Sequence, residues 1–287
     1  MSRIVFAFMY LIHFLPLALV AKIGNAVGAL LFWLIAERRR VTRINLGKCF
    51  PEMDPQAREQ LARAHFRVFC RSFLERGILF WAPRRRIERL VRIEGMENLR
   101  KIRGPVILFA PHFVGLDATL SRLSLELPVA MMYSRQKDPA LERVLYRGRT
   151  RFGGRMIPRQ AGVKEGLAAI RSGAAYYYLP DLDYGPKRSI FVPFFGVPAA
   201  TVTGLSYISR ETGAAVLPCV TRMLPGGGGY VAKIYPRWEN FPTGDDAADT
   251  RRMLAFIEER VLEMPEQYYW LHKRFKTRPA GEQGFYA

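Results

Sequence analysis

A histidine and an aspartate five positions apart are the most distinctive chemical feature of the chain. His112 and Asp117 lie in the segment APHFVGLDA, directly after the apolar run PVILFA (105–110). A carboxylate one helical turn from an imidazole can accept its N–H, fix its tautomer and raise the basicity of the other nitrogen. We therefore expect His112 to be a general base oriented by Asp117. The alternative is a structural histidine, because the same spacing also arises by chance.

The sequence supplies no obvious nucleophile for this pair. The G-x-S-x-G elbow that carries the serine of α/β-hydrolases does not occur in the chain. A histidine–aspartate pair without its own nucleophile suits a reaction in which the substrate supplies the attacking hydroxyl. This favours acyl transfer directly to an alcohol.

Cysteine and histidine usage gives no sign of a metal centre. The 3 cysteines are scattered and form no C-x-x-C pair, and the 4 histidines do not cluster with them. We therefore expect free thiols in a reducing compartment, no metal site and no cofactor.

Alternating strands and helices are expected to position the pair. Apolar runs predict strands at 105–110, 128–134, 155–159, 174–181, 214–224 and 230–238, and helices at 115–127, 139–151, 162–173 and 249–264. This order predicts an α/β fold: a single αβα-layered domain with a mixed, largely parallel sheet. Reactive groups in such sheets gather at the carboxyl ends of strands, which is where His112 falls.

The first forty residues predict a membrane anchor. Residues 4–21 are 18 residues without a formal charge, just long enough to span a bilayer. Arg38 to Arg40 follow the apolar region and would keep that end in the cytoplasm. We expect one anchor helix within residues 1–36 and an acyltransferase domain over 37–287. A cleaved signal peptide and a buried core hairpin are the alternatives, and Pro16 indicates a kink or a turn in any of the three.

The charge balance indicates an anionic partner. The chain has 44 Lys and Arg against 25 Asp and Glu, a formal net charge of +19. Beside an apolar anchor, this excess favours an anionic membrane surface. The chain has no zinc spacing and no RNP-type motif, so a nucleic acid partner is not expected.

The order of motifs resembles the lipid A biosynthesis late acyltransferases, the lauroyl/myristoyl transferase family of the glycerolipid acyltransferase-like superfamily. The resemblance extends from the apolar N-terminus to about Pro279. It is carried by HFVGLD (His112 to Asp117), YSRQKDP (Tyr133 to Pro139), PDLDYGPKRSIFVPFFG (Pro180 to Gly196) and PEQYYWLHKRFKTRP (Pro265 to Pro279).

The resemblance implies a reaction and a place in the cell. Such enzymes take a fatty acyl chain from the thioester of acyl carrier protein. They place it on a hydroxyl of a hydroxyacyl chain of the phosphorylated, usually Kdo-bearing, lipid A precursor. In that superfamily the His-x4-Asp/Glu pair is catalytic, and Asp117 stands where many relatives have glutamate. The expected location is the cytoplasmic face of the bacterial inner membrane.

Further site residues follow from residue chemistry and the position of the motifs. We expect Arg135 to donate to the oxyanion and Arg159 to bind a substrate phosphate. The other predicted substrate-binding residues are Asp181, Asp183, Tyr184 and Gly185. The predicted acyl-chain groove is lined by Phe191, Phe194 and Phe195, for which plain core packing is the alternative.

Three other functions fit the same residues. One is the same chemistry on another acceptor, such as a lysophospholipid or an aminolipid. Another is a hydrolase in which His112 activates water. The third is a non-catalytic, basic membrane-binding protein.

Overall fold

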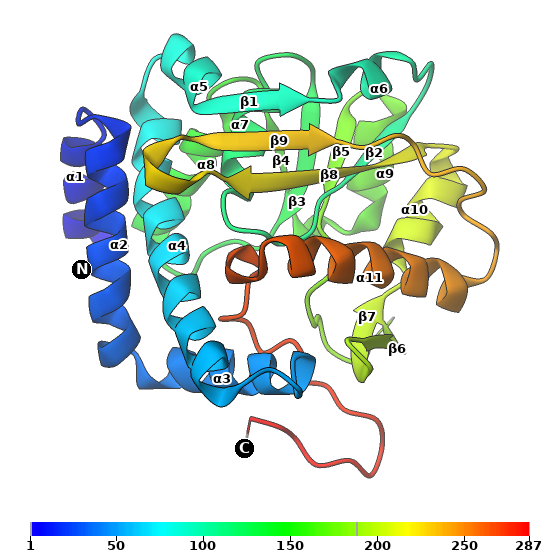
Figure 1. Ribbon diagram of the computed structural model, residues 1–287. Helices are drawn as coiled ribbons and strands as arrows, with labels where there is room; N and C mark the ends of the chain where they lie inside the picture. The colour runs from blue at the N-terminus through cyan, green and yellow to red at the C-terminus, as the bar shows by residue number, and fades with distance from the viewer. Residues whose placement is uncertain (1, 188, 287) are drawn as a thin grey trace.

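Within residues 2–187 and 189–286, which the computed structural model describes, seven strands form one mixed sheet (Figure 1). The strand order is β1-β9-β8-β2-β5-β3-β4, and all neighbours are parallel except β8 and β9. The strands are β1 (Val91–Glu94), β2 (Val106–Phe109), β3 (Val129–Tyr133), β4 (Arg155–Pro158), β5 (Ala175–Tyr178), β8 (Ala215–Met223) and β9 (Tyr230–Ile234).

Helices cover both faces of this sheet. They are α1 (Ser2–Ile12), α2 (Leu17–Leu34), α3 (Ala36–Cys49), α4 (Pro55–Trp81), α5 (Arg84–Leu90), α6 (Met96–Arg100), α7 (Leu116–Leu123), α8 (Pro139–Thr150), α9 (Val163–Arg171), α10 (Gly204–Thr212) and α11 (Asp246–Glu263). Short 3₁₀ turns are η1 (Arg159–Ala161), η2 (Pro225–Gly227) and η3 (Pro265–Gln267). The predicted α/β class, with a mixed and largely parallel sheet, is confirmed.

The central strand β2 shows how the sequence builds the layers. Ile107 and Phe109 belong to a core shared with α9, α10 and α11. Val106 and Leu108 point the other way and pack with residues of α7. Successive side chains of a strand face opposite sides, so an uninterrupted apolar run fits a strand that is buried on both faces.

A second, two-stranded sheet was not predicted from the sequence. Strands β6 (Ser189–Phe194) and β7 (Val197–Val202) form an antiparallel hairpin outside the main sheet. Each carries a proline, and Pro193 lies opposite Pro198. Proline argues against a strand unless the strand lies at an edge, as both do in a two-stranded ribbon.

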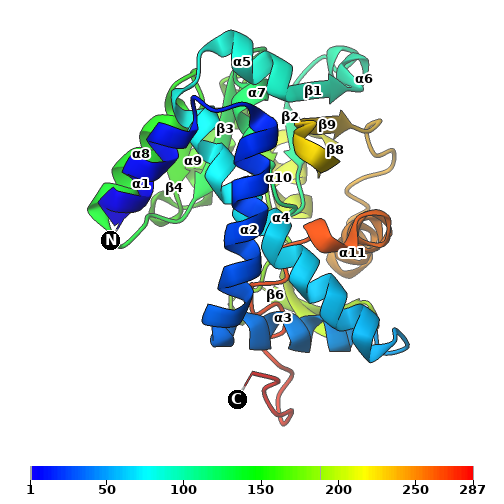
Figure 2. The same ribbon diagram turned by 60° about the vertical axis from the view of Figure 1, so that its left-hand side comes forward.

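The N-terminal region is a helical hairpin and not a single span (Figure 2). Pro16 separates α1 from α2, so the predicted helix over residues 4–21 is wrong as a continuous element. In the described part of the chain, α2 is the one helix that is long and apolar enough to cross a membrane, and 28% of it is buried against protein.

One face of α2 packs tightly on α4. A Cβ on Gly24 would lie 2.5 Å from the Cα of Arg71, and one on Gly28 would lie 2.5 Å from the Cα of Arg67. Glycine therefore allows the two helix backbones to approach closely. The opposite face exposes apolar side chains; those exposed by more than half on α2 are Leu30, Trp33 and Leu34. The helices predicted as a separate anchor thus share a core with the rest of the chain.

Candidate active site

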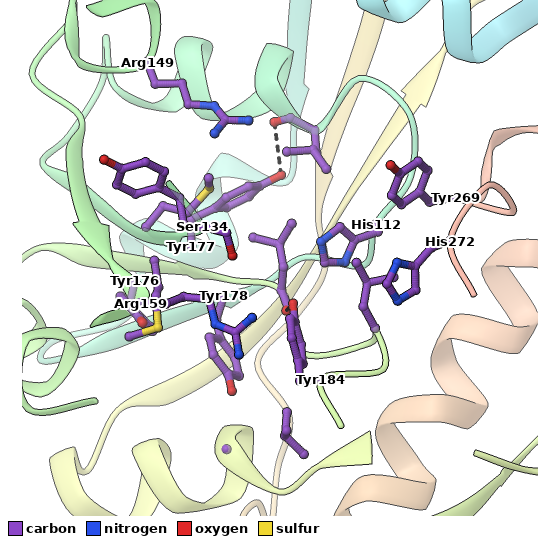
Figure 3. A pocket seen from close by; sticks show the side chains of 18 of the residues that line it. His112, Ser134, Arg149, Arg159, Tyr176, Tyr177, Tyr178, Tyr184, Tyr269 and His272 are labelled. Carbon is purple, nitrogen blue, oxygen red and sulfur yellow. Dashed lines mark hydrogen bonds between the residues drawn. The ribbon is translucent and has the colours of Figure 1, made fainter. Parts of the chain in front are cut away.

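Four parallel strands end at one edge of the sheet, and a large cavity opens there (Figure 3). His112 follows β2, Asp181 follows β5, Ser134 follows β3 and Arg159 follows β4. The cavity has a volume of about 1320 Å³, and residues of α4, α7, α8, α9 and α10 complete its lining. This volume exceeds that of a typical small-molecule pocket, so the cavity has room for a lipid chain.

His112 is held by a buried carboxylate that is distant in sequence. Its Nδ1 lies 2.6 Å from Oδ1 of Asp181, and its backbone N–H donates to Oδ2 of Asp181 at 3.0 Å. Asp181 is fully buried. Burial works to raise the pKa of Asp181, but the charge and hydrogen bonds of His112 outweigh it and lower the pKa. Since Nδ1 is engaged, Nε2 of His112 is the nitrogen available to a substrate in the cavity.

Asp117 has a different environment from the one predicted. Its Oδ1 accepts from Nε of Arg149 at 2.8 Å, and its Oδ2 lies 2.7 Å from Nε of Arg76. Asp117 is buried. Burial works to raise its pKa, yet the two guanidinium groups lower the pKa to about 2. The carboxylate is therefore ionised and bound to arginines, and the carboxylate that orients His112 is that of Asp181.

The position of a helix start explains the difference. Side chains share a helix face when they are three or four residues apart in a continuous helix, but His112 and Asp117 are five apart and α7 begins only at Leu116. Gly115 precedes it with φ of +85°, a left-handed conformation that turns the chain. His112 lies in the non-helical loop before this turn, so His112 and Asp117 do not share a helix face.

The C-terminal segment fixes the loop that carries His112. The N–H of Val114 donates to the carbonyl of Gln267 at 2.8 Å, and the N–H of Tyr269 donates to the carbonyl of His112 at 3.0 Å. Between them, Phe113 and Tyr268 form an isolated antiparallel bridge. The segment PEQYYWLHKRFKTRP therefore holds the backbone of His112 in position.

The turn after β5 is held by the same segment. Oδ2 of Asp183 accepts from the N–H of Thr277 at 2.6 Å, and Oδ1 accepts from the Thr277 hydroxyl at 2.9 Å and from the N–H of Gly185 at 2.9 Å. Asp183 and Gly185 thus support the turn rather than face the cavity. Tyr184 does line the cavity, and the guanidinium of Arg159 lies 4.5 Å from its ring centroid. Arg188 of this motif lies outside the described residues.

The predicted acyl-chain groove is wrong for this cavity. Phe194 is fully buried and packs against Phe195, Tyr268 and Phe275. Phe191 is exposed on β6, because alternate residues of the hairpin face solvent. The alternative of plain core packing describes Phe194.

The structure also differs from the prediction that Arg135 donates to the oxyanion. Arg135 is exposed in the loop after β3 and interacts with Tyr133 and Glu142. It is not among the residues that line the cavity within the described chain. Its guanidinium is therefore not placed to stabilise charge beside His112.

Several cavity residues were not predicted. Tyr269 stacks near His112, with ring centroids 6.4 Å apart, and His272 stacks on Tyr269 at 6.3 Å. Burial, with the charges of His112 and Arg274, lowers the pKa of His272 to about 4, so this imidazole is neutral at physiological pH. The conspicuous motif around Tyr269 was the available signal for these two residues. Nothing local singled out Arg76 or Arg149.

An α/β sheet with a histidine–carboxylate pair at its carboxyl edge is the arrangement of an enzyme rather than of a binding module. The chain belongs to the bacterial lipid A biosynthesis acyltransferase family, whose model matches residues 2–277.

Three acyltransferases of Escherichia coli K12 agree with this membership. The lipid A biosynthesis lauroyltransferase of Escherichia coli K12 is 34% identical over 278 residues, which cover 95% of this chain and 90% of that protein. The palmitoleoyltransferase of the same organism is 33% identical over 277 residues, covering 95% and 90%. Its myristoyltransferase is 30% identical over 268 residues, covering 92% and 82%. The solved 1-acyl-sn-glycerophosphate acyltransferase of Thermotoga maritima aligns over 84% of this chain and 97% of that chain, with a TM-score of 0.39 and 18% identity.

Proposed function

We propose that this acyltransferase moves a fatty acyl chain from the thioester of acyl carrier protein to a hydroxyl of a hydroxyacyl chain on the Kdo-bearing lipid A precursor. Family membership supports the acyl transfer and the class of acceptor. The observation that carries the mechanism is the bond of 2.6 Å between Nδ1 of His112 and the buried carboxylate of Asp181. The basic surface suits an acidic carrier protein.

The proposed chemistry is direct attack without an acyl-enzyme. Nε2 of His112 takes the proton of the acceptor hydroxyl as its oxygen attacks the thioester carbonyl carbon. Asp181 stabilises the imidazolium that forms. The tetrahedral intermediate then collapses: the carbon–sulfur bond breaks, and the thiol leaves with the proton from the imidazolium. The products are one ester and one free thiol, and His112 returns to its starting state.

The proposed location is the cytoplasmic face of the bacterial inner membrane. Helices α1 and α2 supply the apolar surface, and Ile4, Leu11 and Phe14 continue the exposed apolar side chains of α2. Arg38, which follows α2, donates to the carbonyl of Leu271 and so ties the basic end of this region to the C-terminal segment. Residues 1–36 would anchor the domain formed by 37–287.

The mass of the product tests this function. Detergent-purified enzyme and the His112→Ala variant are each incubated with mixed-length acyl carrier protein thioesters and the lipid A precursor. One added acyl ester with the wild type, and none with the variant, supports the proposal. Free fatty acid formed at the same rate with and without acceptor would instead identify a hydrolase. Ester formed on a lysophospholipid but not on the lipid A precursor would identify another acceptor.

A further inference from the structure

Three helices bring two arginines onto one buried carboxylate at the wall of the cavity. Arg76 comes from α4, Asp117 from the first turn of α7 and Arg149 from α8. Asp117 accepts from Nε and Nη2 of Arg149 at 2.8 and 3.3 Å, and its Oδ2 lies 2.7 Å from Nε of Arg76. Both arginines line the cavity, where their side chains remain 21% and 13% exposed. Figure 3 shows the guanidinium of Arg149 among the cavity side chains.

The charges of this cluster do not cancel. Two guanidinium groups share one carboxylate, so the cluster carries one net positive charge. The contacts with Asp117 engage the inner nitrogens, Nε of Arg76 and Nε and Nη2 of Arg149. The terminal nitrogens of Arg76 and Nη1 of Arg149 can therefore donate hydrogen bonds to a ligand in the cavity. A guanidinium presents five N–H donors in a fixed fork, so Asp117 leaves a preorganised set of donors.

We propose that Arg76 and Arg149, oriented by Asp117, form a subsite for a phosphate group of a substrate. Two guanidinium forks match the several oxygens and the charge of a phosphate. Leu141, Leu145 and Phe73 line the same cavity, so the ligand joins a phosphate to apolar chains. Asp117 is then a positioning residue of this subsite. The inference rests on the proposed function, since both substrates of that reaction carry phosphate.

The phosphate has two possible sources, the acceptor disaccharide and the pantetheine arm of the donor. Steady-state kinetics on Arg76→Gln, Arg149→Gln and Asp117→Asn, with each substrate varied in turn, distinguishes them. A hydrogen bond to a charged group is worth about 10- to 100-fold in binding. A KM raised by about that factor for the acceptor, with kcat within about fivefold, assigns the phosphate to the acceptor. The same rise for the donor alone assigns it to the pantetheine arm.

An acceptor that lacks its phosphates sharpens the test. The wild type should bind this acceptor about as weakly as Arg76→Gln binds the phosphorylated acceptor. Removal of the phosphates should weaken the binding of the acceptor to Arg76→Gln only slightly further. Arg237→Gln is the matched control, since Arg237 is an exposed arginine paired with Glu239. It should leave both KM values unchanged. Asp117→Glu, which restores the carboxylate, should recover most of the affinity lost in Asp117→Asn.

Binding of inorganic pyrophosphate to the purified enzyme gives a readout that does not need turnover. It should raise the thermal midpoint of the wild type and have less effect on Arg76→Gln, whose partly exposed side chain makes misfolding a minor concern. The subsite would be refuted by unchanged KM values in folded Arg76→Gln and Arg149→Gln together with equal pyrophosphate protection. Failure of the wild type to form any ester would refute the proposed function instead, and the pyrophosphate comparison would still stand.

Discussion

Replacing Asp181 by asparagine tests which carboxylate, that of Asp181 or that of Asp117, orients His112. The amide of Asp181→Asn keeps the shape and can still accept from the backbone N–H of His112. It loses the negative charge that lies beside Nδ1 at 2.6 Å in a fully buried position. In the proposed mechanism, the imidazolium formed when His112 takes the hydroxyl proton would then lack its counter-ion.

The size of the effect follows from that lost charge. Two unit charges about 4 Å apart, at an effective dielectric constant of about 20, attract by about 4 kcal/mol. This corresponds to roughly a thousandfold in rate, within the range of about 10² to 10⁴ typical of general acid–base catalysis. We expect kcat of Asp181→Asn to fall by about 10³, with little change in the KM of either substrate.

The assay is ester formation at saturating donor and acceptor, with Asp183→Asn as the matched control. Asp183 is also buried, two residues away, and accepts from Thr277 rather than from His112. Its variant should lose about 1–3 kcal/mol of folding free energy and keep kcat within tenfold. If Asp181→Asn retained kcat within tenfold while Asp117→Asn lost a thousandfold, the assignment of Asp181 to His112 would be wrong.

Four further predictions concern stability and membrane binding. Gly24→Leu should destabilise the protein by more than about 2 kcal/mol in denaturant titration, because its Cβ meets the α4 backbone at 2.5 Å. Gly47→Ala, with nothing within 4 Å, should stabilise α3 by up to about 1 kcal/mol. Burial lowers the pKa of His65 from 6.5 to about 4. The unfolded chain therefore binds a proton below about pH 6.5 that the folded chain excludes, and stability should fall by up to about 3 kcal/mol as the pH drops from 6.5 to 4. His65→Gln should flatten that slope, and an unchanged slope would assign it to other groups. The double variant Leu30→Ser and Trp33→Ser should weaken flotation with anionic vesicles at least tenfold, whereas undiminished flotation would place the membrane surface elsewhere.

The sequence predicted features that depend on local periodicity. Uninterrupted apolar runs such as 105–110 fit strands buried on both faces, and every predicted strand contains an observed one. The carboxyl-edge position of His112 followed from the same pattern, because parallel strands end at one edge. The family was visible because its motifs are long.

Contacts between residues that are far apart in the sequence could not be predicted from local periodicity. His112 and Asp181 are 69 positions apart, and the pair depends on β2 lying beside β5. Asp117 was assigned to His112 from their spacing alone, and that spacing does not show the left-handed turn at Gly115 or the arginines that bind Asp117. Arg76 reaches Asp117 through the packing of α4 against α7.

The C-terminal segment has a consequence for the timing of activity. The two loops that present His112 and Asp181 are held by Gln267, Tyr268, Tyr269 and Thr277. Those loops are synthesised much earlier than the residues that hold them; Asp183, for example, precedes Thr277 by 94 residues. A ribosome-bound chain therefore carries both reactive groups long before they are fixed in place. We therefore expect the enzyme to become competent only after residues 265–277 have emerged and paired with these loops. Synthesis itself thus delays catalysis until the molecule is complete, and a chain shortened before Pro265 should be inactive while keeping every side chain of the His112–Asp181 pair.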